Sequence, residues 1–317
     1  MHKIGIAGHT GMVGQEIQKV LSGHDSVEIV YKKNSTYEEG RLNDCELVFL
    51  ATKDLESMSF SDTAIKNGVK IIDMSGAYRL PRDLFEKWYG IRHLFPEYIK
   101  KAVYGMPALN LGQIKNSRLT ANPGCYPTSV ILALKPLKGL IKEENISIVS
   151  TSGNSGGRRE CEEISNEVTY SCGRKHKHVP EMELYSGFKV DFTPIVLRSV
   201  FKGINTNIRA ELTDDLKNIP EEEAKTILEN AIKNAYCKDD RIFIVEDRED
   251  KTYGTKDVND THDMLIKIGI DEGKVYINSL IDNLMKGAAS LGAENMNIML
   301  GLDRLHGIEI KERRTGI

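Results

Sequence analysis

The stretch that decides the fold is residues 3–14, KIGIAGHTGMVG. Its first six residues read as a short apolar strand, and GQEIQKVLSG after it has apolar positions near helical spacing up to Gly23. The glycines between strand and helix form a G-x-x-G-x-x-G loop, which lets a pyrophosphate approach the backbone and the free N–H groups of the helix. The alternative is a glycine-rich turn that binds no ligand. We predict a dinucleotide site made by Gly8, Thr10, Gly11, Met12, Val13 and Gly14.

The end of the second strand bears on which dinucleotide binds. NAD sites place an acidic residue there to bind the ribose 2′-hydroxyl. Here the strand VEIVY, residues 27–31, runs into Lys32 and Lys33. Two cations suit a 2′-phosphate better than a free diol, so the sequence favours NADP, unless both lysines are merely solvated.

The order of predicted strands and helices indicates an α/β protein with two domains. Up to about residue 146, short apolar strands alternate with helical stretches, which is typical of a parallel sheet. The later strands are longer and alternate in polarity, which suits a largely antiparallel sheet. The apolar stretch NLMKGAASLGAENMNIMLGL is expected to return as a helix to the first domain. We predict a nucleotide-binding domain of residues 1–146 and 284–317, and an inserted α+β domain of residues 147–283.

Composition excludes several classes of protein. The chain has 317 residues and a net charge of −3, which gives no electrostatic footprint for nucleic acid or an anionic membrane. It opens without a signal-peptide pattern, and no apolar run reaches the roughly 18 residues of a membrane span. The five cysteines are odd in number and form no C-x-x-C pair, which favours reduced thiols and a cytoplasmic location.

One cysteine has the surroundings of a nucleophile. Cys125 lies in N-P-G-C-Y-P-T, residues 122–128, directly before the apolar helical stretch SVILALKPL. Gly124 permits a sharp turn and Pro127 suits a first helical turn, so the helix dipole favours a thiolate at Cys125. Such a thiolate could attack a carbonyl or an acyl phosphate. For most of the other cysteines a buried apolar role is the more natural interpretation.

A second motif, H-K-H-V-P-E at residues 176–181, offers a proton shuttle. Pro180 can start a helix, which leaves His178 just before it and Glu181 in its first turn. A nearby carboxylate would orient the imidazole for general acid–base catalysis. The residues alone leave His176 open as the alternative. No fourth ligand with zinc-site spacing is evident, so we expect no metal.

Substrate contacts are harder to assign. S-G-N-S-G-G-R-R, residues 152–159, closes a strand with a flexible loop and two cations. Either that pair or the arginine at the end of DMSGAYR could hold a phosphate group. The residues that we assign to the substrate are Asn122, Ser152, Arg79, Arg158 and Arg159.

With these motifs in hand, the chain resembles the N-acetyl-γ-glutamyl-phosphate reductase family. The resemblance is carried by N-P-G-C-Y-P-T, S-G-N-S-G-G, H-K-H-V-P-E, F-T-P (192–194) and D-N-L-M-K-G-A-A (282–289), and it is closest to the shorter form of the family. It implies a Rossmann-type NADP-binding domain with an inserted catalytic and dimerisation domain, a layout shared with aspartate-semialdehyde dehydrogenase. It also implies Cys125 as nucleophile, His178 as acid/base with Glu181 nearby, and further cofactor contacts from Ser75, Gly76, Ser155, Gly156 and Asn283.

The resemblance further implies a reaction, in which an acyl phosphate is reduced to an aldehyde by NADPH through a thioester on Cys125. The small acyl phosphate would be the partner molecule, and the protein would be a homodimer or homotetramer. The longer form reads S-G-x-S-G-A-G-R where this chain has Gly157, Arg158 and Arg159, so the arginine that meets the substrate stays open. Aspartyl phosphate, a carrier-linked aminoadipyl phosphate and a non-catalytic NADP-binding redox sensor are the alternatives.

Overall fold

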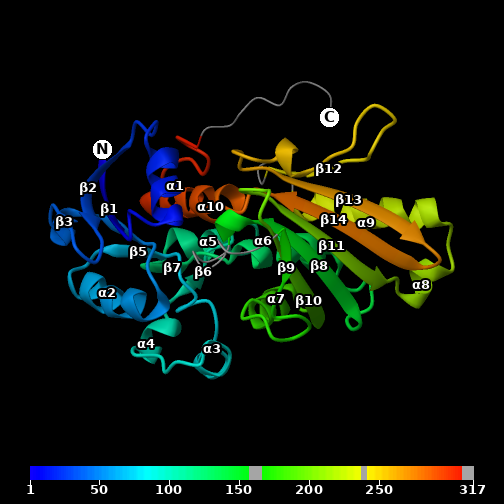
Figure 1. Ribbon diagram of the computed structural model, residues 1–317, viewed down its shortest axis with the longest axis horizontal. Helices are drawn as coiled ribbons and strands as arrows, with labels where there is room; N and C mark the ends of the chain where they lie inside the picture. The colour runs from blue at the N-terminus through cyan, green and yellow to red at the C-terminus, as the bar shows by residue number, and fades with distance from the viewer. Residues whose placement is uncertain (157–165, 237–240, 309–317) are drawn as a thin grey trace. The chain divides into compact units, whose positions relative to one another are not determined.

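The computed structural model describes residues 1–156, 166–236 and 241–308. Within this part, the chain divides into two compact units, residues 1–124 with 288–308, and residues 125–287 (Figure 1). The sequence predicts boundaries near 146 and 284, whereas the structure divides the chain at Gly124 and Ala288. The difference at the first boundary is the helix that begins at Cys125. Its Ser129 hydroxyl bonds to Thr206 and Ser279 of the second sheet, so the helix belongs to the second unit.

Unit 1 is built on one twisted sheet. In the described residues the strand order is β3-β2-β1-β4-β5-β7-β6, and every pairing is parallel except β2 with β3. β1 lies between β2 and β4, so the chain reverses direction across the sheet at the carboxyl end of β1, where doubly wound folds bind nucleotides. The strands are β1 (His2–Ala7), β2 (Val27–Lys33), β3 (Glu38–Glu39), β4 (Leu47–Leu50), β5 (Lys70–Asp73), β6 (Val103–Tyr104) and β7 (Leu119–Ala121).

Helices cover both faces of this sheet, which explains why its strands are continuous apolar runs. One apolar core lies under α1 (Met12–Leu21), α5 (Pro107–Lys115) and α10 (Ser290–Leu300) (Figure 1). The other core lies under α2 (Asp54–Lys66), α3 (Arg82–Tyr89) and α4 (Pro96–Ile99). The Rossmann-type arrangement predicted for the first domain is therefore confirmed, with α10 supplied by the end of the chain.

Unit 2 is built on a second sheet of order β12-β13-β14-β11-β8-β10-β9 in the described residues. Four of its six pairings are antiparallel, and β8–β10 and β12–β13 are parallel, which confirms the largely antiparallel sheet predicted from sequence. The strands are β8 (Ile146–Gly153), β9 (Glu167–Thr169), β10 (Val190–Leu197), β11 (Ile204–Glu211), β12 (Ile242–Ile244), β13 (Met264–Asp271) and β14 (Lys274–Ile281).

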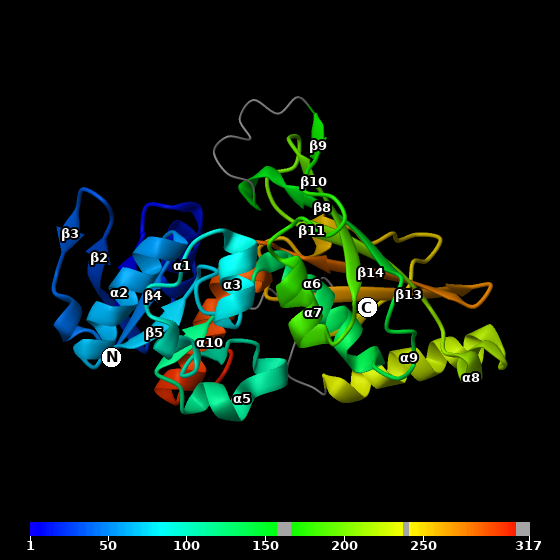
Figure 2. The ribbon, with the colours of Figure 1, turned by 90° about the horizontal axis from the view of Figure 1, so that it is seen from below.

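Alternation along the strands of this sheet gives it two unlike faces. In β11, for example, Thr206 and Ile208 are buried while Asn207 between them is exposed. The helices are α6 (Cys125–Leu134), α7 (Val179–Ser186), α8 (Asp214–Lys217) and α9 (Glu221–Ala235). α6 packs on β11 and β14, α7 on β10 and α9 on β13, and α6 and α7 lie side by side (Figure 2). A turn of π-helix, Met285–Ala289, leads from unit 2 into α10.

Within the described residues, no helix is both long enough and apolar enough to span a membrane.

Candidate active site

The glycine loop follows β1 as predicted, and two of its glycines are required by the chain itself. Gly8 has a φ of +84°, and a Cβ there would lie 2.2 Å from the Ala51 carbonyl oxygen. A Cβ on Gly14 would lie 2.2 Å from the Gly8 carbonyl oxygen. Gly11 differs, because its φ is −73° and a Cβ would meet only the Gly8 oxygen, at an ordinary 3.5 Å. The fold therefore leaves room for a side chain at Gly11, which is the glycine beside the start of α1.

The start of α1 suits an anion. Gly11 is its N-cap and offers no side-chain hydrogen bond to the first helical N–H groups. Thr10 and Met12 are exposed, and Val13 is half-buried. An uncapped helix start next to an open glycine fits the pyrophosphate of a dinucleotide.

The two lysines at the end of β2 are not equivalent. Lys33 Nζ lies 2.5 Å from a carboxylate oxygen of Glu38, whose other oxygen accepts a hydrogen bond from the Tyr31 hydroxyl at 2.7 Å. β3 supplies Glu38, and sequence reasoning missed this two-residue strand. In the described part of the chain, Lys32 has no carboxylate at ion-pair distance. Lys32 is therefore the lysine whose charge is left for a ligand.

The residues predicted at the end of β5 make close contacts within unit 1. The Ser75 hydroxyl donates to the buried carboxylate of Asp73, at 3.0 Å. A Cβ on Gly76 would lie 2.1 Å from the Tyr89 hydroxyl oxygen, so a larger residue there would have to displace the Tyr89 side chain. Burial raises the pKa of Asp73, while its hydrogen bonds from Ser57 and Ser75 oppose that shift. These contacts fix the strand end, and they neither add nor remove a cofactor contact for Ser75 and Gly76.

Two of the residues assigned to the substrate have partners inside unit 1. The guanidinium of Arg79 is buried and donates to the carbonyl oxygens of Asn122, at 2.8 Å, and Met74, at 2.9 Å. The Asn122 amide is also buried, and it accepts from Asn295 at 3.0 Å and donates to the Ala288 carbonyl at 3.3 Å. These bonds favour positioning roles for Arg79 and Asn122 over the predicted substrate contacts. Arg158 and Arg159 lie outside the described residues.

Cys125 is the first residue of α6, as the sequence predicts. The nine residues after it in the helix are all buried, which anchors its backbone, and its own side chain is half-buried. A helix start stabilises a thiolate through its dipole and free N–H groups. Gly287 packs directly against it, because a Cβ there would lie 2.8 Å from the Cys125 Cβ. Gly287 is the glycine of the D-N-L-M-K-G motif, and its role was not predicted.

Aromatic rings surround the residue that follows the cysteine. The Tyr126 ring lies 5.8 Å from the His176 ring, 6.0 Å from the His178 ring and 5.1 Å from the Phe192 ring, all in edge-on geometry. Burial raises the pKa of Tyr126, so its phenol stays protonated. The structure therefore brings both predicted histidines into one ring cluster with Tyr126, the residue that follows Cys125 in the chain.

The two histidines have different environments. His176 is buried, and its Nδ1 accepts the His178 backbone N–H at 3.1 Å. Burial, together with the charge of Lys177, lowers the pKa of His176 to about 4, so its ring is neutral at physiological pH. His178 is half-buried and occupies the N-cap position of α7 without a side-chain capping bond, and Glu181 is fully buried in the first turn. His178 is thus the more accessible imidazole.

The remaining cofactor candidates of unit 2 converge at the ends of β8 and β14. The Asn283 side chain accepts the Gly203 N–H at 2.8 Å and donates to the Ser155 hydroxyl at 3.1 Å. A Cβ on Gly156 would lie 3.0 Å from the buried Ser152 hydroxyl oxygen. Ser152, which we assign to the substrate, therefore lies in one cluster with Ser155, Gly156 and Asn283, which we assign to the cofactor.

Sequence reasoning missed a buried pair next to Gly287. Lys286 Nζ lies 3.1 Å from His262 Nε2, and both side chains are almost fully buried. Asp282 fixes the same turn, because its carboxylate accepts the N–H groups of Leu284 and Met285. The D-N-L-M-K-G motif was the only signal in the sequence, and it gave no indication of His262.

Comparison with known proteins identifies the family to which the chain belongs. Residues 32–117 match the family model described as the semialdehyde dehydrogenase NAD binding domain, and residues 125–283 match the semialdehyde dehydrogenase dimerisation domain. These two matches identify the chain as a two-domain NAD(P)-dependent semialdehyde dehydrogenase. The first match lies in the unit with the nucleotide-binding sheet, and the second begins at Cys125, the first residue of α6. More narrowly, the chain belongs to the N-acetyl-gamma-glutamyl-phosphate reductase family, on the sequence relatives described next.

Those relatives match along nearly their whole length. The N-acetyl-gamma-glutamyl-phosphate reductase of Clostridium novyi is 34% identical, with 98% of this chain and 99% of that protein covered. The enzyme of the same name from Methanococcus maripaludis is also 34% identical, with 98% of each chain covered. The Clostridium novyi alignment spans 353 positions, so that relative has segments that this chain of 317 residues lacks.

Solved structures agree on the fold. Aspartate semialdehyde dehydrogenase II of Vibrio cholerae superposes with a TM-score of 0.71 at 17% identity, covering 95% of this chain and 98% of that one. The Candida albicans enzyme, solved with NADP, gives 0.68 at 16% identity, with the same coverage. The predicted likeness in layout to aspartate-semialdehyde dehydrogenase is therefore confirmed.

Proposed function

We propose that this chain reduces N-acetyl-γ-glutamyl phosphate to N-acetylglutamate semialdehyde and phosphate, with NADPH as reductant, in arginine biosynthesis and in the cytoplasm. The observation that carries the proposal is Cys125 at the start of α6, followed directly by Tyr126, whose ring packs against the rings of His176 and His178. The names of the sequence relatives support this substrate over other acyl phosphates.

The first step forms a covalent bond. The Cys125 thiolate attacks the γ-carbonyl carbon, an S–C bond forms, and the C–O bond to phosphate breaks with its electron pair leaving on inorganic phosphate. The N–H groups at the start of α6 stabilise the oxyanion that develops on the carbonyl oxygen. The product is a thioester, which accepts hydride far more readily than a carboxylate does.

The second step returns the thiolate. NADPH, when bound, supplies the hydride that the thioester carbon accepts. The tetrahedral adduct collapses, its C–S bond breaks, and the aldehyde leaves as the sulfur regains its charge. His178, the accessible imidazole of the cluster, supplies and takes up the proton that moves on and off the oxygen. His176 holds the backbone N–H of His178 in place.

The choice of NADP over NAD rests on Lys32. Its charge is not neutralised by a carboxylate in the described residues, whereas Lys33 is paired with Glu38. The open face of Gly11 and the uncapped start of α1 fit the pyrophosphate. A 2′-phosphate would therefore meet one available cation at the end of β2.

The proposed substrate is small and free in solution. A carrier-linked substrate would call for basic side chains around the site, and Arg174, Lys175 and Lys177 are the candidates. Arg174 is instead held by Glu183, whose oxygens lie 2.5 and 2.9 Å from its two terminal nitrogens. That pairing reduces the basic surface available to an acidic carrier protein.

The reaction can be assayed in reverse, as phosphate-dependent reduction of NADP⁺ with purified semialdehydes. We expect the largest kcat/KM with N-acetylglutamate semialdehyde. A larger value with aspartate semialdehyde, or with a carrier-linked aminoadipate semialdehyde, would transfer the chain to that substrate. Absence of turnover with all three, together with tight NADPH binding, would favour a redox sensor.

The thioester is tested by Cys125→Ser. The variant should bind NADPH and form no aldehyde, and mass spectrometry of wild type mixed with acyl phosphate alone should show one acyl group on Cys125. Cys172→Ser is the matched control, because Cys172 is exposed and has no part in the mechanism. Substantial turnover by Cys125→Ser would rule out covalent catalysis.

The role of His178 is tested by His178→Asn in the same assay. We expect kcat to fall by roughly 10²- to 10⁴-fold, the effect of losing a general acid–base catalyst.

A further inference from the structure

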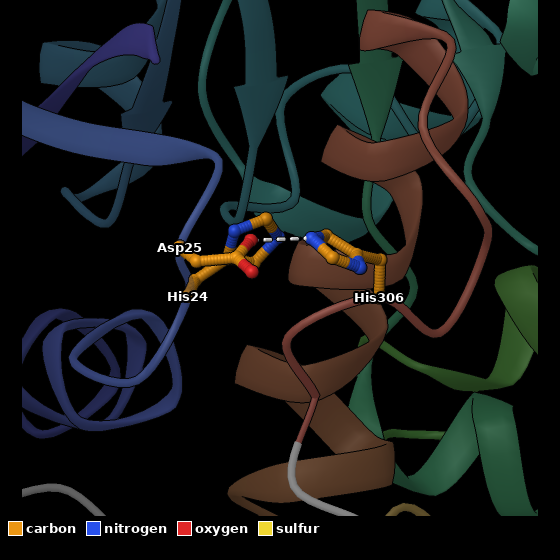
Figure 3. Close-up of side chains that lie close together, drawn as sticks. All are labelled: His24, Asp25 and His306. Carbon is orange, nitrogen blue, oxygen red and sulfur yellow. Dashed lines mark hydrogen bonds and ion pairs between the residues drawn. The ribbon is translucent and has the colours of Figure 1, made fainter.

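Two imidazoles and a carboxylate meet in unit 1, and none of them belongs to the site described above (Figure 3). His24 and Asp25 lie in the turn between α1 and β2, and His306 lies in the segment after α10. One candidate ligand atom from each residue falls within 4.8 Å of the other two. His306 Nε2 is 2.7 Å from an oxygen of Asp25 and 2.9 Å from the Ser26 hydroxyl oxygen.

A buried asparagine fixes which nitrogen of His24 is free to accept. The Asn297 amide nitrogen donates to the carbonyl oxygens of Arg304, at 3.2 Å, and His306, at 2.7 Å. The amide oxygen therefore faces His24 Nε2, at 2.9 Å, and that nitrogen must carry the proton. The lone pair is then on Nδ1. An imidazole whose far N–H is held by a buried oxygen is the usual arrangement of a metal-binding histidine.

The chain around His24 keeps the ring in this position. Gly307 has a φ of +66°, and a Cβ there would lie 2.2 Å from the His24 ring carbon Cδ2. The backbone of the last described segment thus lies against the ring. The contact made by Nδ1 is a long one, to the Ser26 N–H at 3.3 Å, which a stronger partner can replace.

The other two candidate ligands reach solvent. The side chains of Asp25 and His306 are 79% and 36% exposed. Zinc ligands at about 2.0–2.2 Å from the ion are about 3.3 Å from one another, so atoms as far apart as 4.8 Å would close by up to about 1.5 Å, and the Asp25–His306 pair, now at 2.7 Å, would open slightly.

We propose that His24, Asp25 and His306 form a site for one divalent transition-metal ion of the Zn²⁺ type, with solvent as the remaining ligand. Two imidazole nitrogens and one carboxylate oxygen are a donor set that Zn²⁺ accepts. The ion fastens the segment after α10 to the turn before β2, two parts of unit 1 that are distant in sequence. Sequence spacing gives no sign of the site, because His306 and His24 lie at opposite ends of the chain.

The test is equilibrium dialysis of the full chain against micromolar Zn²⁺ after alkylation of the accessible thiols, with bound metal measured by atomic emission. Wild type should retain one more ion per chain than His306→Asn or Asp25→Asn. The temperature of unfolding should rise with Zn²⁺ in wild type and rise less in both variants. Asp25→Asn changes an exposed side chain, so it keeps the test valid if His306→Asn folds poorly.

His2→Asn is the matched control, because His2 also pairs with a carboxylate, Glu46 at 2.9 Å, but is not among the three residues of the site. It should bind as much Zn²⁺ as wild type. Equal metal content in wild type, His306→Asn and Asp25→Asn would overturn the proposal, as would binding that begins only at millimolar metal. Neither result would bear on the reductase, because the assay measures bound ion and unfolding and does not depend on turnover.

Discussion

His176 and His178 have the same side chain and lie two positions apart, yet they differ in burial and therefore in the role that each imidazole can take. His176 is enclosed by Tyr126, Tyr170 and Phe192, and its pKa falls to about 4. Its ring therefore stays neutral and serves as a fixed acceptor for the His178 N–H. The motif H-K-H-V-P-E could not assign these roles, because burial of His176 depends on rings from other elements.

The lowered pKa of His176 makes stability depend on pH. Between pH 4 and 6.5 the unfolded chain binds a proton at His176 that the folded chain does not, so folded stability falls as pH drops through that window. At pH 5 this amounts to about 2 kcal/mol. Urea unfolding followed by near-ultraviolet circular dichroism should show that wild type loses about this much more stability than His176→Asn between pH 7.5 and 5. Equal losses would show that His176 titrates normally.

Lys32 and Lys33 form the second contrast between neighbouring residues. We predict that Lys32→Ala raises KM for NADPH by roughly 10- to 100-fold, the value of a charge-assisted hydrogen bond to phosphate, and leaves KM for NADH unchanged. Lys33→Ala is the control and should have the smaller effect, because Glu38 already neutralises Lys33. Steady-state kinetics with both cofactors measure this. A larger effect from Lys33→Ala would assign the 2′-phosphate to Lys33.

At the scale of elements, two glycines of the β1–α1 loop have different roles: Gly14 is needed for folding, and Gly11 for binding the ligand. Gly14→Ala should destabilise unit 1, since its Cβ would overlap the Gly8 carbonyl oxygen. Gly11→Ala should leave the unfolding temperature nearly unchanged, because its φ is ordinary and its Cβ meets nothing closer than 3.5 Å. We expect Gly11→Ala nevertheless to weaken NADPH binding at least about tenfold, as the methyl group meets the pyrophosphate. Unchanged binding, measured by fluorescence titration, would remove the pyrophosphate from Gly11.

The elements that sequence predicted well are those encoded by neighbouring residues. The strand–glycine–helix unit, the cysteine at the start of α6 and His178 at the start of α7 all follow from local turn and helix chemistry. Contacts between distant residues could not be predicted in this way. β3 has only two residues and therefore no periodicity, so the ion pair between Lys33 and Glu38 could not be predicted from the sequence.

Arg79 and Asn122 show the same limit. Both are polar residues beside motifs, and ligand binding was a reasonable interpretation of the sequence. Their partners lie just after β5 and β7, in α10 and in the turn before it. Only the folded chain shows that Arg79 and Asn122 donate to backbone carbonyl oxygens and that the Asn122 side-chain oxygen accepts from Asn295. The boundary at Gly124 has a similar cause, since Ser129 finds its partners on strands about 80 and 150 residues later.

At the scale of the whole molecule, the open face of the second sheet remains to be explained. Val149 and Tyr276 are 40% and 43% exposed there, and they line a shallow hollow on this face. Beside them, Asn278 donates to the side-chain oxygens of Asn205 and Asn207, which holds three amides in one array. Ordered amides around exposed apolar side chains are suited to a flat protein interface.

We propose that a second copy of the chain covers this face, because the unit that carries it matches the semialdehyde dehydrogenase dimerisation domain. Tyr276→Lys combined with Val149→Lys should convert the oligomer to monomer, since two chains would each bring two unpaired cations to the interface. Sedimentation velocity measures the mass. Leu184→Lys is the control, because Leu184 is equally exposed but lies on α7, and it should leave the oligomer intact. An unchanged mass in the double variant would place the interface elsewhere on the chain. A monomeric wild type would instead show that no copy of the chain covers this face, whatever the variants do.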